Sequence, residues 1–153
     1  MTSLSFWLDF AGVFLSLTGY ILGLGGVTVI EFHAFLGRKS SYWTEATIRT
    51  HKITKPMIWI GLITIAIGSL FLYRNIGIQD IALLQLLLGI PLALNGLYLT
   101  LKISPYLLKN EQEGHARDLL PENIQKPIFA AFLFSFIGWW TEAVLFALHL
   151  VMN

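Results

Sequence analysis

Four long apolar runs, separated by shorter polar segments, dominate the pattern of this chain. They extend from about residue 4 to 36, 56 to 73, 81 to 101 and 127 to 152. A bilayer core about 30 Å thick is crossed by roughly 20 helical residues, so each run is close to or above that length. Helices satisfy their own backbone in lipid, whereas four short strands would not close a barrel. The pattern predicts an all-α membrane protein, a bundle of four transmembrane helices.

Two of the runs open with the same short motif. Residues 53–56 read Ile-Thr-Lys-Pro, and residues 124–127 read Ile-Gln-Lys-Pro. Proline is tolerated in the first turn of a helix, where its missing N–H has no partner to lose. We therefore expect Pro56 and Pro127 to start the second and fourth spans, and residues 37–50 to connect the first two.

The shared motif belongs to a wider internal match. Gly19, Gly23 and Gly26 of the first span align with Gly89, Ala93 and Gly96 of the third at a constant offset of seventy residues. The offset is seventy-one at the Lys-Pro pairs, so we expect one inserted residue in the intervening loop. The match predicts a single membrane domain, residues 1–153, made of two parallel two-helix repeats, 1–75 and 76–153, related by an axis along the membrane normal.

Every span also carries a stripe of small residues. The spacings are three, four or seven, which places each stripe on one helical face. Such faces let helix backbones approach closely in lipid, but they carry no chemistry by themselves. The four stripes are Gly12, Ser16, Gly19 and Gly23; Gly61, Thr64 and Gly68; Gly89, Ala93 and Gly96; and Ala131, Ser135 and Gly138.

The composition and the charges agree with a membrane location. Hydrophobic residues make up 56% of the chain and charged residues 12%, which is too apolar for a soluble domain of this length. Nine of the ten basic residues lie in the segments that follow the first and the third span, on one side of the membrane. Only Arg74, which follows the second span, lies on the opposite side. The positive-inside rule then places both termini outside the cytoplasm. The first run is too long for a cleavable signal peptide, and the absence of cysteine excludes disulfides and thiolate metal sites.

Polar side chains inside the apolar runs are the first candidates for function. Glu142 continues the stripe of the fourth span, with Ser135 seven residues before it and His149 seven residues after it. An ionisable group at that depth is costly and is a functional hypothesis by default. The alternative is a protonated acid hydrogen-bonded to another helix. Either way we expect Glu142 to face the bundle interior. Asp9 either approaches Glu142 or His149 across the bundle or complements the helix dipole.

A second group of candidates lies on the basic side of the membrane. Imidazole nitrogen binds zinc, copper or haem iron, so His33 and His51 are candidate cofactor ligands and, with Glu31, candidate metal ligands. Glu31 and His33 point about 200° apart on a helix, and the chain has no compact metal motif. We predict that His51 lies close enough to His33 for one ion or ligand to contact both. The alternative is a solvated His51.

The first half of the chain resembles a known group of proteins. Residues 25–39, GGVTVIEFHAFLGRK, lead through a basic segment to residues 51–68, HKITKPMIWIGLITIAIG. This stretch is similar to small bacterial membrane proteins that include HemJ-type protoporphyrinogen oxidases and the membrane domain of CopD-type copper resistance proteins. The resemblance covers about residues 5–72 and implies a haem-linked redox role or a copper role in the bacterial inner membrane. Such proteins begin the first span with a ligand histidine; here Asp9 or Phe10 stands in that place, and His33 is the histidine carried over.

Three classes of function remain open. The first is a redox or tetrapyrrole-binding membrane protein with haem or a divalent metal as its cofactor. The second is a small transporter or channel module with a polar path around Glu142. The third is a non-catalytic structural or assembly subunit, in a homo-oligomer or a larger membrane complex. The bilayer is the partner in each case, and no nucleic-acid partner is expected. Motifs of kinases and hydrolases are absent from the sequence.

Overall fold

A computed structural model describes residues 3–75 and 80–152. The helices are α1 (Ser3–Gly37), α2 (Ser41–Leu72), α3 (Asp80–Tyr98), the π-helical turn η1 (Leu99–Ile103), α4 (Ser104–Gln112) and α5 (Glu122–Met152). The turn η1 joins α3 and α4 into one third span, so four helices are long and apolar enough to cross a membrane. The described parts of the chain contain no strand, which confirms the predicted all-α four-helix bundle.

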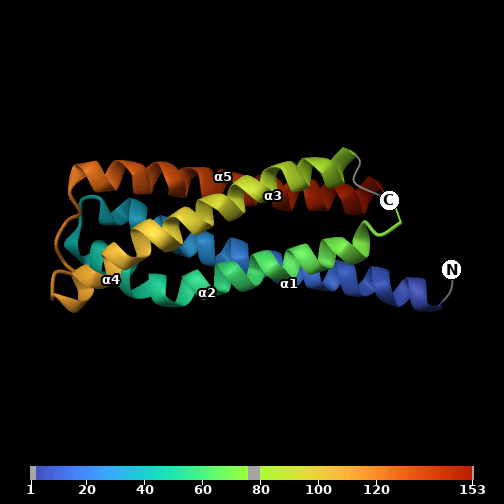
Figure 1. Cartoon of the computed structure of the whole chain (residues 1–153), viewed down its shortest axis with the longest axis horizontal. Helices are drawn as coiled ribbons and strands as arrows, with labels where there is room; N and C mark the ends of the chain where they lie inside the picture. Colours follow the sequence, from blue (N-terminus) through green and yellow to red (C-terminus); the bar gives the residue numbers. More distant parts are fainter. Residues whose placement is uncertain (1–2, 76–79, 153) are drawn as a thin grey trace.

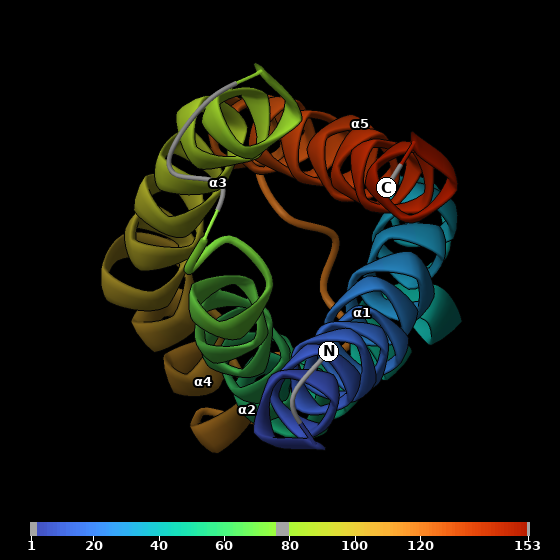
Figure 2. The same cartoon turned by 90° about the vertical axis from the view of Figure 1, so that its right-hand side faces the viewer.

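The four spans form a ring in the order α1, α2, third span and α5, and α5 closes against α1 (Figure 2). Both termini lie at one end, and the connections from α1 to α2 and from α4 to α5 lie at the other (Figure 1). Neighbouring spans are therefore antiparallel. A twofold rotation about the bundle axis would exchange α1 with α3 and α2 with α5, which is the order that two parallel repeats require. The repeat itself stays a prediction.

Glycines bring α1 and α2 into the closest contact in the bundle. An added Cβ on Gly19 would lie 2.6 Å from the carbonyl oxygen of Gly61, and one on Gly61 would lie 2.5 Å from the nitrogen of Gly23, whereas real Cβ atoms essentially never approach closer than 3.0 Å. Gly12 faces Gly68 in the same way. Contacts seven residues apart on both helices keep one face of each together, as in left-handed supercoiled pairs. The predicted packing role of these small residues is confirmed.

The prediction that two prolines start the second and fourth spans is wrong. Pro56 and Pro127 lie inside α2 and α5. Helix α2 begins at Ser41 because its polar first part is paired: Glu45 contacts Arg49 and Arg117, each at 2.7 Å. One proline in a long helix removes one backbone hydrogen bond and does not end a helix that is held on both sides. Most of the expected connection at residues 37–50 is therefore helical.

The third span contains the most irregular backbone of the bundle. A π turn holds one residue more than an α turn. Accordingly, η1 offers a place for the residue that raises the repeat offset from seventy to seventy-one, where the sequence had suggested the loop. Two side-chain bonds tie this region to α2: Trp59 Nε1 donates to Thr100 Oγ1 at 3.1 Å, and Lys55 Nζ donates to Ser104 Oγ at 3.2 Å.

Apolar side chains cover the outside of the bundle as well as its core. Ile21, Leu70 and Val151 are each more than 70% exposed. In water, so many exposed apolar side chains would drive association, whereas in lipid they contact acyl chains. This outer surface fits a bundle that crosses a membrane.

Candidate functional site

A cavity of about 60 Å³ lies inside the half of the bundle that carries the basic residues, and all four spans contribute to it. Three ionisable side chains line it: Glu31 from α1, and His51 and Lys55 from α2. Ser135 of α5 and Thr100 of η1 add hydroxyl groups. The structure thus gathers three of the predicted candidates, Glu31, His51 and Ser135, around one internal space. Lys55, from the Ile-Thr-Lys-Pro motif, also lines it.

One nitrogen of the His51 imidazole lacks a protein partner among the described residues. This atom, Nε2, is buried. Lys55 lies one helical turn further along α2 and is anchored to Ser104. A buried polar atom without a protein partner is normally satisfied by water, and the cavity has room for it. We therefore expect His51 to contact water in this cavity.

A second polar cluster occupies the other half of the interior, nearer the termini. Its centre is Glu142, which is only 7% exposed, so its predicted interior position is confirmed. The hydroxyl of Tyr20 donates to Glu142 Oε2 at 3.5 Å and to the Glu142 backbone oxygen at 3.2 Å. Gln85 Nε2 donates to the Tyr20 hydroxyl at 3.2 Å, and the Tyr73 hydroxyl donates to Gln85 Oε1. All four spans meet in this cluster.

One oxygen of the Glu142 carboxyl group has no hydrogen-bond partner in this cluster. Glu142 Oε1 is buried and has no hydrogen-bond partner among the described residues. It faces Gly89 of α3, where an added Cβ would lie 3.6 Å away. His149 is two turns closer to the terminal end of α5 and is 7% exposed, with its ring 4.7 Å from that of Tyr73. The carboxyl and the imidazole therefore belong to one buried polar region.

An apolar layer separates the cavity from the cluster. Leu92 of α3 and Trp139 of α5 are 5% and 3% exposed, and both also border the cavity. Trp139 packs on Gly23, and Leu92 packs on Gly138, where an added Cβ would lie 2.6 Å from the leucine. Closely packed apolar side chains among the described residues thus lie between the two polar regions.

Two other candidate residues lie outside both polar regions. Asp9 forms an ion pair with Arg74 at 2.7 Å instead of approaching Glu142 or His149. The ring of His33 packs 5.2 Å from that of Trp43, and His33 does not border the cavity that His51 lines. The described residues contain no group of three or more histidine, aspartate or glutamate side chains placed to hold a metal ion. Glu31, His33 and His51 therefore do not form one metal centre.

Sequence reasoning missed Tyr20, Tyr73 and Gln85. Gln85 offered a signal, since it is the only strongly polar side chain among the apolar residues 81–94. The tyrosines offered less, because tyrosine is common near membrane interfaces. Only the ring arrangement of the helices shows that these three side chains converge on Glu142.

Comparisons of the chain with models of protein families, with curated proteins and with solved structures found no match. The resemblance to the HemJ-type and CopD-type group stays a prediction.

Proposed function

We propose that this protein is a small membrane transport module that moves protons through the interior of its bundle. One observation carries the proposal: ionisable side chains from different spans meet inside the bundle on both sides of a single apolar layer. Packing alone does not require them, since buried ionisable groups in a membrane are costly. A gated pathway is expected to have this arrangement, with one polar region on each side of an apolar layer that blocks passage between them.

The charge distribution gives the pathway a direction. The nine basic residues accompany the connections at the end opposite the termini. The positive-inside rule supports a cytoplasmic position for that end in the bacterial inner membrane, with both termini outside. The cavity with Glu31 and His51 then communicates with the cytoplasm, and the cluster around Glu142 with the outer side.

The side chains favour protons over metal or alkali cations. Lys55 places an ammonium group at the cavity with Glu31 and His51, and this charge repels a free cation. A carboxyl group, an imidazole and cavity water exchange protons without needing an empty ion cage. On the outer side, His149 and the open oxygen of Glu142 supply the same chemistry. The Gln85 amide holds the Tyr20 hydroxyl in place and is not itself a proton carrier.

A haem-linked role has less support from the geometry. A cavity of about 150 Å³ holds one benzene molecule, whereas the cavity beside His51 measures about 60 Å³. A porphyrin is several times larger than benzene and does not fit between the helices as they stand. Two buried imidazole nitrogens without a hydrogen-bond partner among the described residues, Nε2 of His51 and Nδ1 of His33, favour a ligand of this kind, but His33 does not border the cavity. A Soret band in the purified protein would reverse this preference.

Proton flux into liposomes tests the proposal directly. Protein is reconstituted into vesicles that contain a pH-sensitive dye, and a potassium gradient with valinomycin drives proton entry. We expect Glu142→Gln and Glu31→Gln to lower the flux by on the order of tenfold or more, because a removed acid–base group typically costs at least that much in proton transfer. Glu122→Gln is the matched control, since its carboxyl group is 86% exposed at the start of α5.

A substitution in the apolar layer should change the proton flux in the opposite direction. Leu92→Ala shortens a side chain that separates the two polar regions, so we expect faster flux even if the unmodified protein is mostly closed. Leu94→Ala is the control, because Leu94 is 60% exposed on the outside of the same helix. Flux equal to that of empty vesicles, both for the unmodified protein and for Leu92→Ala, would contradict the proposal.

A further inference from the structure

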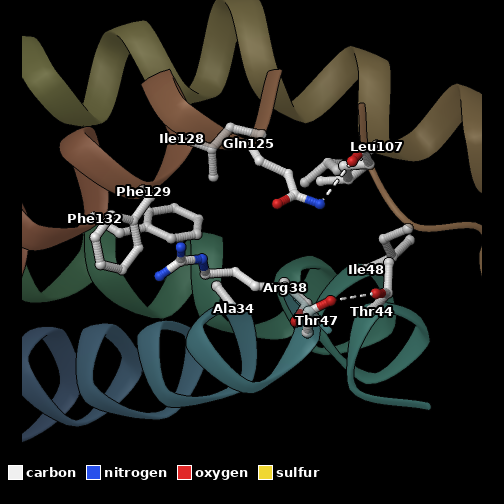
Figure 3. Close-up of a pocket in the computed structure, with 12 residues that line it drawn as sticks. Ala34, Arg38, Thr44, Thr47, Ile48, Leu107, Gln125, Ile128, Phe129 and Phe132 are labelled. Atoms are coloured by element: carbon white, nitrogen blue, oxygen red, sulfur yellow. Dashed lines mark hydrogen bonds between the residues drawn. The ribbon is translucent and has the colours of Figure 1, made fainter. Parts of the chain in front are cut away.

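A second pocket lies at the basic end of the bundle, apart from the internal cavity. Its volume is about 40 Å³, and it is bordered by the end of α1, the start of α2, α4 and the start of α5. Figure 3 shows aromatic rings on one side and Arg38, from the turn directly after α1, reaching towards them. The apolar wall includes Ile48, Leu107, Phe129 and Phe132. The pocket therefore combines one cation with an apolar lining.

The guanidinium group of Arg38 is positioned but lacks an anionic partner. Its central carbon lies 4.6 Å from the centre of the Phe129 ring, a cation–π contact that fixes the plane of the group. Among the described residues, no carboxylate pairs with Arg38, whereas Arg49, Arg74 and Arg117 all do pair with one. An arginine presents five N–H donors in a fork that suits phosphate oxygens. Its free donors point to an anionic ligand.

We propose that this pocket anchors an anionic phospholipid, with the phosphate on Arg38 and the adjoining first carbons of the lipid against the accessible part of the apolar wall. The site lies at the end of the bundle that carries the basic residues, where we expect anionic head groups to gather. Gln125 supports the mouth of the pocket by donating to the Leu120 carbonyl oxygen at 2.6 Å. A free phosphate ion would use Arg38 but leave the apolar wall without a ligand, so the pocket suits an amphiphile better.

Native mass spectrometry of the purified protein tests this site. The protein in detergent is titrated with phosphatidylglycerol or phosphatidylcholine, and the first lipid retained is measured. We expect a clear preference for phosphatidylglycerol. Arg38→Gln should reduce that first binding by on the order of tenfold, because a direct hydrogen bond between a charged donor and a phosphate contributes at least about that factor. Phe129→Leu should weaken it by a factor of about two to five through loss of the cation–π contact.

Lys39→Gln is the matched control for Arg38→Gln. Both variants remove one positive charge from adjacent residues, but Lys39 does not border the pocket. Equal losses in the two variants would mean diffuse attraction to the charged end and would overturn the proposal. Competition by inorganic phosphate as strong as that by phosphatidylglycerol would overturn it as well, because it would show that the apolar wall contributes nothing. Circular dichroism of each variant verifies the fold, and Phe129→Leu tests the pocket with the charge unchanged.

Discussion

Gly61 is the position where the structure predicts the sharpest effect of one methyl group. Gly61→Ala places a Cβ 2.5 Å from the nitrogen of Gly23 and 2.7 Å from the carbonyl oxygen of Gly19, and both are backbone atoms. Ordinary contacts begin at 3.4 Å, so α2 would have to move away from α1 by about 1 Å. A flexible side chain would rotate away from such a contact, but a helix backbone has no such freedom.

The size of the effect follows from two opposing contributions. Overpacking of a close contact costs about 1–3 kcal/mol. Alanine instead of glycine inside a helix is favourable by about 1 kcal/mol in water. Gly25→Ala isolates that second contribution, because nothing lies within 4 Å of the Cβ it would add. We therefore expect Gly61→Ala to be about 1–3 kcal/mol less stable than Gly25→Ala, since the gain in helix propensity cancels between them.

Unfolding in mixed micelles measures this difference. The fraction of sodium dodecyl sulfate is raised stepwise. Unfolding is followed by helical circular dichroism and by the fluorescence of the five tryptophans, of which Trp139 is buried. The free energies of unfolding of the two variants are compared with that of the unmodified protein. If Gly61→Ala unfolds at the same detergent fraction as Gly25→Ala, the close approach of α1 and α2 is refuted.

Two further predictions concern the outer polar cluster and the orientation of the bundle. Tyr20→Phe removes the hydroxyl that Gln85 and Glu142 share and leaves buried polar groups unpaired. The same detergent titration should therefore show a free energy of unfolding lower by about 1–3 kcal/mol. Tyr98→Phe is the control and should lower it much less, because Tyr98 is 42% exposed. A phosphatase reporter fused after residue 153 should be active outside the cytoplasm, and the same reporter inserted between α4 and α5 should be inactive, because the charge bias places these ends on opposite sides. The reverse pattern of activity would invert the orientation.

The sequence predicted the fold well because lipid imposes simple rules on it. Four apolar runs long enough to cross a bilayer are expected to be helical, because a helix satisfies its own backbone hydrogen bonds in lipid. The stripes of small residues identified the faces at which α1 and α2 contact each other. The helix starts were wrong because hydropathy marks where a helix enters lipid, not where its backbone begins. Pro56 shows the difference, since it lies well inside a helix whose polar beginning is stabilised by the Glu45 ion pairs.

The candidate site was only partly predictable. Glu142 stood out because a carboxyl group on a small-residue face of a membrane helix is rare, and its burial followed from its spacing. The cavity did not follow from spacing, because it depends on which spans are neighbours in the ring. The Ile-Thr-Lys-Pro motif likewise does not show that the ammonium group of Lys55 donates to Ser104 of the third span. Contacts between distant spans carry this information, and a local pattern does not contain it.

The packing of the bundle suggests which part moves if the pathway opens. Backbone contact at the glycines fixes α1 against α2, so this hairpin has little freedom. The third span is different: like α2 and α5 it contains a proline, Pro91, directly before Leu92, but among the described helices it alone also contains a π turn, η1, within the next three turns. Sharp kinks in helices occur at prolines and π turns, whereas regular long helices only curve gently. Leu92 is part of the apolar layer, and Gln85 belongs to the outer polar cluster, so a bend in this span would move both side chains at once. The other end of the span is held on α2 by the bonds from Trp59 to Thr100 and from Lys55 to Ser104. The third span is therefore the element whose motion would connect the two polar regions.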